Sequence, residues 1–472
     1  MHTIKIIRGV NRYMDADKNE KKLNRGLKSR HIQMIAIGGS VGVGLFLYSA
    51  ETIQLTGPSV LLNYGIIGFL IYFILRSLGE MAVENPISGS FSAYANKYLS
   101  PVFGYITGWS YWFLWVFAVM AEITAIGKYM NHWVPEEQVP GWVWALAALV
   151  LITIINLTNV KLFGELEFWF AIIKVVTIIA LIAVGFVLII VALINSNQSI
   201  SISNLWNFGG FFPKGFKAFI MTLGPVTVSF IGVESIGLTA GETKDPEKTL
   251  PSAINKVIFR VCLFYIGSLF IIMVLFPWNN MDPEKSPFVL AFEKVGLKFA
   301  GIIINFVVLT ASVSACNSGI FSSSRMSLNL QEQGFAPKIL GKLNKKSIPV
   351  VSVLFSTFFM FFGVLLFKKF PRDAFPLVCS ICAITGIFIW GIILVTQICF
   401  RKKLTAEQIG KLKYKSALFP YSNYACLLFL GFILVLCALS KKFRVAVLIV
   451  PVWILILFTS YFIQKKVKEK VS

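Results

Sequence analysis

Two glycine-containing stretches interrupt apolar runs that are long enough to cross a bilayer. They are Gly38-Gly39-Ser40-Val41-Gly42-Val43-Gly44, the first break, and Phe230-Ile231-Gly232-Val233-Glu234-Ser235-Ile236-Gly237, the second break. A membrane helix bonds all its backbone groups internally because lipid offers no partner, so a break is tolerated only where the freed groups face a cavity or a ligand. Two breaks at corresponding places in two halves indicate the binding site of a transporter.

The composition indicates a membrane protein. Apolar residues make up 56% of the chain, and the mean hydropathy is +0.75. Because each crossing takes about 20 apolar residues, the pattern predicts twelve membrane-spanning helices, with the first at 33–54 and the fifth at 168–193.

The net charge of +22 reflects membrane topology rather than nucleic-acid binding. Most of the 44 Lys and Arg residues lie in the terminal tails and the even-numbered loops. By the positive-inside rule, this distribution places both termini in the cytoplasm. No nucleic-acid-binding motif accompanies the charge. We therefore expect a multi-pass protein of the inner (plasma) membrane, embedded in the lipid bilayer and without a nucleic-acid partner.

Each half of the chain opens with a broken helix and continues with four further spans. Because five is an odd number, the second half enters the membrane from the opposite side, which is an inverted repeat. The predicted segments are a cytoplasmic tail (1–31), the first repeat (32–195), an extracytoplasmic loop (196–216), the second repeat (217–400), a cytoplasmic loop with the last two helices (401–464) and a cytoplasmic C-terminal tail (465–472).

The predicted spans lack the residues and motifs on which most enzyme mechanisms depend. All three histidines and all the aspartates lie outside the predicted spans, and no nucleophile-elbow, metalloprotease or phosphate-loop motif occurs. We expect no enzyme activity, no cofactor and no metal. Cys379 and Cys382 have metal or redox spacing, but no second pair and no histidine lies nearby. Small buried hydrophobic residues are the better interpretation of these two cysteines.

The two breaks suit the two charged ends of an amino acid. The first break begins a half-helix, and its positive dipole end favours a carboxylate, although glycines also permit close helix packing. The second break ends a half-helix, and its freed carbonyls favour an ammonium group. The Phe230 ring either closes over the substrate or packs in the core. The predicted substrate-binding residues are Ser40, Val41, Gly42, Val43 and Gly44 in the first break and Phe230, Ile231 and Gly232 in the second.

Ionisable residues at bilayer depth indicate a specific role, because placing a charge in the hydrocarbon core costs free energy. Lys174 is flanked by apolar residues, and its predicted span contains no acidic residue. It is either a proton-coupling residue or a lysine that snorkels to the cytoplasmic interface. Glu234 follows the second break directly and has a structural or a coupling role. Glu122, in the third span, is more readily structural and is the remaining coupling candidate.

Two further polar features leave alternatives open. Glu80 is better explained as structural, since Arg76 lies one turn earlier and can pair with it. Polar groups in the eighth span hold Na⁺, bond Lys174 in place of that ion, or simply join helices. These are Asn305, Thr310, Ser312, Ser314, Asn317 and Ser318.

Several motifs resemble those of bacterial amino acid permeases of the amino acid–polyamine–organocation superfamily, over about residues 22–415. Two stretches, Phe163 to Phe170 and Asn305 to Ser312, are most similar to the proline-specific branch. The motifs are Leu27-Lys28-Ser29-Arg30-His31-Ile32-Gln33-Met34, Gly79-Glu80-Met81-Ala82-Val83-Glu84-Asn85-Pro86, Gly104-Tyr105-Ile106-Thr107-Gly108-Trp109, Ala240-Gly241-Glu242-Thr243-Lys244-Asp245-Pro246-Glu247-Lys248, and Phe163-Gly164-Glu165-Leu166-Glu167-Phe168-Trp169-Phe170.

The resemblance implies an all-α leucine-transporter-like fold, a 5+5 inverted repeat with helices 1 and 6 broken. It also implies proton-coupled uptake by alternating access, with a lysine like Lys174 where sodium-coupled relatives hold a cation. Two departures bear on the substrate: Val43 replaces the usual hydroxyl residue, and Ile231-Gly232 replaces Gly-Gly. We expect symport of a neutral amino acid with protons, with proline as the first candidate. An amino acid exchanger and a non-transporting nutrient sensor are the alternatives.

Overall fold

The computed structural model describes residues 42–87, 89–158, 160–195, 199–238, 245–282, 285–294 and 298–471. Every regular element in these ranges is a helix, which confirms the predicted all-α fold class. The predicted tail 1–31 and two predicted site residues, Ser40 and Val41, lie outside the described residues.

Eleven segments of the described chain are long and apolar enough to cross a membrane. The first of them, Tyr48–Glu84, holds the last third of the first predicted span and the whole of the second. The start of the first span lies outside the described residues, so eleven segments correspond to the twelve predicted spans. The other ten are Pro101–Met130, Gly141–Thr158, Gly164–Ile194, Gly215–Leu238, Pro246–Leu275, Gly301–Glu332, Val350–Lys369, Ala374–Lys402, Tyr421–Leu439 and Arg444–Glu469.

The first predicted repeat contains a short broken helix followed by four long helical segments. Gly57, at a φ of +68°, and Pro58 turn the chain between the broken helix and the first of these long segments. Its helices are α3 (Val43–Phe46), α4 (Tyr48–Thr56), α5 (Val60–Glu84), α6 (Ser90–Tyr94), α7 (Pro101–Met130), α8 (Gly141–Thr158) and α9 (Val160–Ile194).

The second predicted repeat also opens with a broken helix. Its helices are α10 (Gly215–Val226), α11 (Ser235–Leu238), α12 (Pro246–Asn255), α13 (Val257–Arg260), α14 (Ser268–Leu275), α15 (Pro287–Lys294), α16 (Lys298–Glu332), α17 (Val350–Lys369) and α18 (Ala374–Lys402). The chain then continues through α19 (Ala406–Lys411), α20 (Tyr421–Leu439) and α21 (Arg444–Val471).

The second break occurs where its glycines predict it, and for the first break the described residues show the start of the helix that follows it. At the first, α3 begins at Val43, and Gly42 before it is extended. At the second, Pro225 interrupts the backbone bonding of α10, a 3₁₀ turn follows at Thr227–Phe230, and Gly232 has a φ of +94°. Proline removes a backbone donor and glycine alone adopts that φ without strain, so the sequence itself ends this helix.

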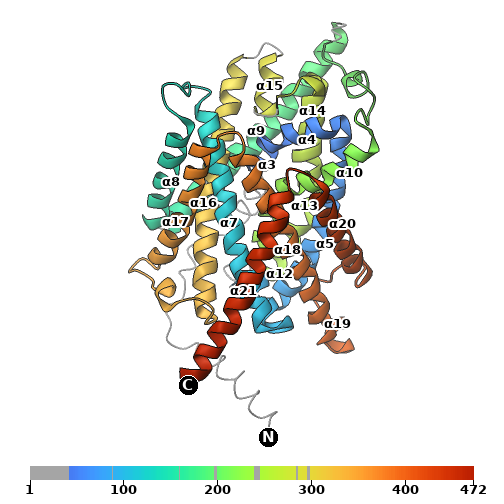
Figure 1. The fold of residues 1–472 in the computed structure, drawn as a ribbon. Coiled ribbons are helices and arrows are strands. Elements are labelled where there is room, and N and C mark those ends of the chain that lie inside the picture. The colour runs from blue at the N-terminus through green and yellow to red at the C-terminus, as the bar shows by residue number, and fades with distance from the viewer. Residues whose placement is uncertain are drawn as a thin grey trace.

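The bundle is arranged around α7, which packs against α16 and α18. These three helices run through the middle of the molecule, and the short helix α3 lies beside them (Figure 1). The helices α15 and α4 lie at one end of the bundle, whereas α19 and the C-terminus lie at the other (Figure 1).

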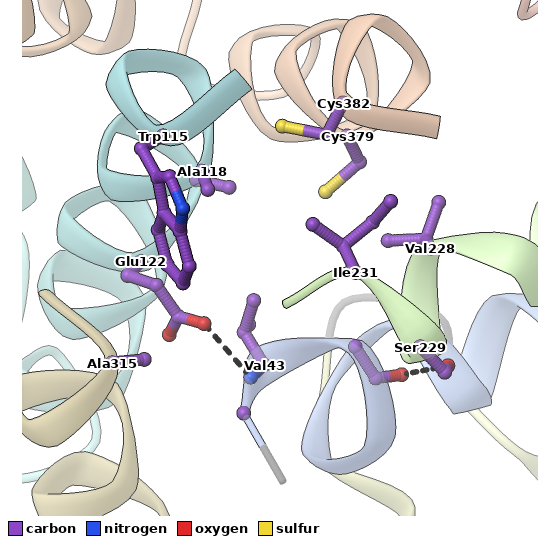
Figure 2. A pocket seen from close by; sticks show the side chains of 13 residues that line it. Val43, Trp115, Ala118, Glu122, Val228, Ser229, Ile231, Ala315, Cys379 and Cys382 are labelled. Atoms are coloured by element: carbon purple, nitrogen blue, oxygen red, sulfur yellow. Dashed lines mark hydrogen bonds between the residues drawn. The ribbon is translucent and has the colours of Figure 1, made fainter. Parts of the chain in front are cut away.

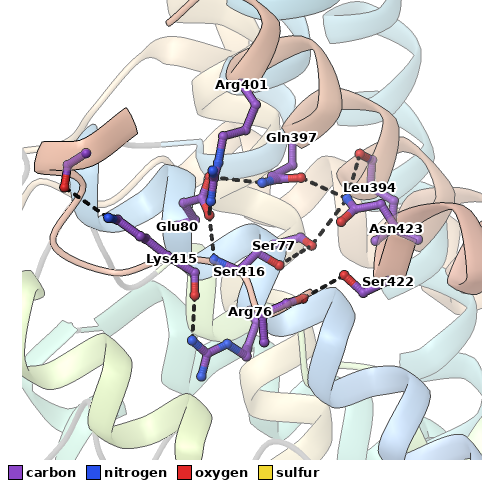
Figure 3. Close-up of polar contacts among 12 residues, drawn as sticks. Arg76, Ser77, Glu80, Leu394, Gln397, Arg401, Lys415, Ser416, Ser422 and Asn423 are labelled. Carbon is purple, nitrogen blue, oxygen red and sulfur yellow. Dashed lines mark hydrogen bonds and ion pairs between the residues drawn. The ribbon is translucent and has the colours of Figure 1, made fainter. Parts of the chain in front are cut away.

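Glu80 is held by a partner that the sequence did not suggest. Its buried carboxylate accepts hydrogen bonds from Arg401 Nη2 at 2.7 Å, Gln397 Nε2 at 2.9 Å and the Ser416 backbone N–H at 2.5 Å (Figure 3). We call these four residues the Glu80 clasp. It joins α5 to α18 and to the segment before α20, which supports the structural role predicted for Glu80.

The expected pairing of Glu80 with Arg76 is therefore wrong. The Arg76 guanidinium turns instead to the Tyr72 hydroxyl, 3.1 Å away, and stacks 4.6 Å from the centre of the Tyr414 ring. Spacing of one turn permits an ion pair within a helix, but a bidentate arginine on a neighbouring helix competes more strongly for a buried carboxylate.

Glu80→Ala should lower the free energy of unfolding by about 3 kcal/mol, because Arg401 and Gln397 would keep buried donors without their acceptor. Thermal unfolding of the purified protein in detergent measures this change. The matched control is Glu407→Ala, which removes an exposed pair with Lys411 and should change little. Equal melting temperatures for the two variants would contradict the importance of the clasp.

Candidate functional site

The first break is in direct contact with the turn that leads into the second break. The Ser229 hydroxyl, in the turn before the second break, donates to the Gly44 carbonyl at 2.8 Å. A Cβ atom placed on Gly44 would lie 2.7 Å from the Ser229 Cα atom, so only glycine permits this approach. Tyr64 and Tyr265 fix Ser229 further: the Tyr64 hydroxyl lies 2.9 Å from its Oγ, and the Tyr265 hydroxyl donates to its carbonyl at 2.9 Å.

A cavity of about 50 Å³ lies between the two breaks and the helices α7, α16 and α18. Four of the predicted substrate-binding residues line it, namely Gly42, Val43, Gly44 and Ile231, with Val228 and Ser229 beside them (Figure 2). The sequence therefore located the two breaks that form this cavity.

Glu122 faces the first break from α7. Its Oε1 accepts a hydrogen bond from the Val43 backbone N–H at 3.1 Å (Figure 2). A Cβ atom on Gly42 would lie 2.7 Å from that oxygen, so the glycine makes room for the carboxylate. The sequence predicted that the backbone N–H groups of the first break bind the substrate carboxylate. In this structure the Val43 N–H is bonded to the Glu122 carboxylate instead.

Phe230 points away from the cavity in this structure. Its ring stacks on Tyr265, with centroids 5.1 Å apart and an interplanar angle of 8°, and the residue is 1% exposed. Neither Phe230 nor Gly232 lines the cavity. Of the two roles expected for this ring, packing in the core is the one that the structure displays.

Glu234 lies just beyond the second break and outside the cavity lining. It is 1% exposed, and its Oε2 accepts a hydrogen bond from the Trp390 indole at 3.1 Å. Its other oxygen has no hydrogen-bond partner among the described residues. Glu234 therefore joins the second break to α18, and its coupling role stays a prediction.

Lys174 is fully buried, which excludes the snorkelling alternative. Its Nζ donates to the Ser314 hydroxyl at 3.0 Å, and that hydroxyl donates to Glu167 Oε1 at 2.7 Å. One of the alternatives left open for the eighth span is thus realised, because a hydroxyl on α16 bonds Lys174. Ser314 precedes Ala315, which lines the cavity.

Glu167 is the functional candidate that the sequence analysis missed. The predicted span began at residue 168, so Lys174 was described as having no acidic residue in its own span. In the structure α9 begins at Val160, and Glu167 is buried two turns before Lys174 on the same helix face. The sequence does contain a signal for this pair, because Glu167 precedes Lys174 by seven residues and so lies on the same helix face. Glu167 belongs to the motif Phe163 to Phe170, which the sequence analysis used only for the family resemblance.

Cys379 and Cys382 are buried, as expected, and both are free cysteines. They also line the cavity opposite the first break, where α18 presents both sulfur atoms (Figure 2). Their spacing of three residues places them on one helix face. Trp115 and Ala118 on α7 complete this wall.

The cavity has an apolar lining with a single carboxylate. Apart from the two thiols, Glu122 is the only ionisable side chain that lines it in the described chain. Val43 donates to Glu122 Oε1, and Glu122 Oε2 has no hydrogen-bond partner among the described residues. No Lys, Arg or His of the described chain lines the cavity, so an anionic substrate side chain would meet no opposite charge there.

Comparison with known proteins identifies the family. The amino acid permease family model matches residues 31–471. The uncharacterized amino acid permease YtnA of Bacillus subtilis is 51% identical over 94% of this chain and 96% of its own length. The amino-acid permease AapA of Bacillus subtilis is 45% identical over 96% and 97%. The aromatic amino acid transport protein AroP of Escherichia coli K12 is 42% identical over 97% and 99%. These relatives give no support to the expected proximity to the proline-specific branch.

Gly44→Ala should lower the initial rate of amino acid uptake by at least about tenfold, because overpacking against the Ser229 backbone costs more than 1 kcal/mol. Uptake by proteoliposomes, normalised to the amount of folded protein, measures the effect. Gly431→Ala is the matched control, since a Cβ atom there meets nothing within 4 Å. Equal uptake by both variants would show that the contact between the breaks is dispensable.

Proposed function

Because the chain belongs to the amino acid permease family, we propose that it takes up a neutral amino acid with an apolar side chain, together with protons. The observation that carries the proposal is a fully buried lysine beside a cavity between two broken helices. A charge at that depth persists only with a function or a partner.

The lining of the cavity supports the substrate class. Trp115, Val228 and Ile231 offer apolar contacts, and the alanines that line the cavity add small apolar side chains. The relative AroP is named for aromatic amino acid transport, so aromatic and small apolar amino acids are the first candidates here. Proline, the first expectation from the sequence, becomes one member of the test panel.

Competition for one backbone donor supports coupling to protons. The substrate carboxylate and Glu122 would both need the Val43 N–H. Two carboxylates in one small apolar cavity repel each other unless a proton or a cation offsets their charge. A proton taken up by Glu122 frees the Val43 donor, so substrate and proton enter the site together.

Lys174 supplies the second part of the coupling. Its ammonium group is held by the Ser314 hydroxyl, which also donates to Glu167, and it takes the position of a bound cation between α9 and α16. Gain or loss of its proton changes the relative stability of two arrangements of the first break, which is what alternating access requires. Both termini lie in the cytoplasm in this proposal, as the distribution of Lys and Arg predicts.

Proteoliposomes with an alkaline interior test the function. Labelled L-alanine, L-phenylalanine and L-proline are supplied outside, and we expect the pH gradient to drive accumulation of at least one of them into empty vesicles. Unlabelled L-lysine and L-glutamate should not compete. Uptake that requires internal substrate would identify an exchanger, and binding without flux would identify a sensor; either result overturns the symport proposal.

Lys174→Ala should abolish accumulation driven by the pH gradient while exchange of internal for external substrate continues, because Lys174 does not line the cavity. Lys217→Ala, which removes an exposed lysine, is the matched control and should accumulate substrate normally. Glu167→Gln keeps the shape of the chain and should weaken accumulation in the same direction. Full accumulation by Lys174→Ala would place coupling at Glu122 or Glu234 instead.

A further inference from the structure

A second and larger cavity lies at the end of the bundle away from the Glu80 clasp. It measures about 620 Å³ and is bounded by the end of α7, the start of α16, the turn after α17 and α15. The helix α15 lies at the end of the molecule opposite to the C-terminus (Figure 1). By the predicted topology, this outer cavity opens to the outside of the cell.

Charges of both signs line the outer cavity. Lys128, Lys285 and Arg372 are cationic, whereas Glu136 and Glu293 are acidic. A purely anionic or purely cationic ligand would face groups of its own sign here. A zwitterion places its carboxylate near the cations and its ammonium group near the carboxylates, so both sets of charges are satisfied.

Buried hydroxyl groups without partners also belong to this cavity. Ser286 and Tyr129 line it and are 3% and 4% exposed. Neither the Ser286 Oγ nor the Tyr129 hydroxyl has a hydrogen-bond partner among the described residues. Leaving a buried hydroxyl unpaired is costly, so water or a ligand group must complete it.

Tyr129 connects the outer cavity to the central one. It follows Glu122 by seven residues on α7 and therefore lies on the same helix face, roughly 10 Å further along the axis. Its carbonyl accepts a hydrogen bond from Asn305 Nδ2 of α16 at 3.3 Å, which fixes the two helices to each other at this point. The central and outer cavities therefore border the same helix, about two turns of α7 apart.

We propose that the outer cavity is a second binding site for a zwitterionic α-amino acid, occupied before the central cavity. The inference rests on the proposed transport of amino acids. Lys128, Lys285 and Arg372 receive the carboxylate, Glu136 and Glu293 receive the ammonium group, and Ser286 and Tyr129 complete the polar contacts. The site recognises the backbone charges, and the central cavity then selects the side chain.

Equilibrium binding to the full-length protein in lipid nanodiscs tests the second site. The probes are labelled L-alanine, L-phenylalanine and L-proline, each measured separately and whether or not proteoliposomes accumulate it. The wild type should bind about two probe molecules per chain at saturation, and Gly44→Ala, which displaces the Ser229 backbone beside the central cavity, should still bind one. One molecule per wild-type chain would overturn the proposal.

Arg372→Glu reverses a charge in the outer cavity and should leave one bound probe per chain. Loss of a charge-assisted contact should also raise the KM of uptake by about tenfold with little change in maximal rate. Lys369→Glu is the matched control, because it makes the same charge change at an exposed position that does not line the cavity. Equal KM values for the two variants would mean that any change in KM comes from the general surface charge, and this result would reject the site.

The two proposals fail in different ways. A wild type that binds two probe molecules but does not accumulate substrate under a pH gradient retains the outer site and loses the symport. A wild type that accumulates substrate while binding one molecule retains the symport and loses the outer site. No binding and no uptake would reject both.

Discussion

The contact between Gly44 and Ser229 is the constraint on which the rest of the site depends. Each broken helix exposes backbone groups that lipid would not satisfy. The structure satisfies them by placing one break against the other, so that the Ser229 hydroxyl reaches the Gly44 carbonyl and Tyr265 reaches the Ser229 carbonyl. The central cavity lies beside this contact, because helices that stop and restart at one level leave space between their ends.

The buried charged side chains, like the freed backbone groups, are hydrogen-bonded to other parts of the chain. Glu122 is bonded to the first break, Glu234 to the Trp390 indole, and Lys174 to a hydroxyl that also donates to Glu167. Each of these groups joins two helices that the alternating-access proposal requires to move relative to one another. Their bonds are thus the places where a proton changes which arrangement is more stable.

The helix α7 organises both cavities. Glu122 on this helix faces the first break, and Tyr129, two turns later on the same face, borders the outer cavity. The Glu80 clasp lies at the opposite end of the bundle, where it ties α5 to α18 and to the segment before α20. The molecule therefore has the polar outer cavity at one end, the apolar central cavity at the breaks, and the Glu80 clasp at the other end.

Local pattern in the sequence was sufficient for the fold class, the positions of both breaks and four of the residues that line the central cavity. Glycines, prolines and apolar runs act within a few residues of themselves, so their consequences can be derived without the tertiary structure. The partners of the buried charges could not be derived in this way. Glu80 pairs with Arg401 across 321 positions, and Lys174 bonds Ser314 across 140. Such pairs depend on the rotation and depth at which separate helices pack, and only the tertiary structure decides those.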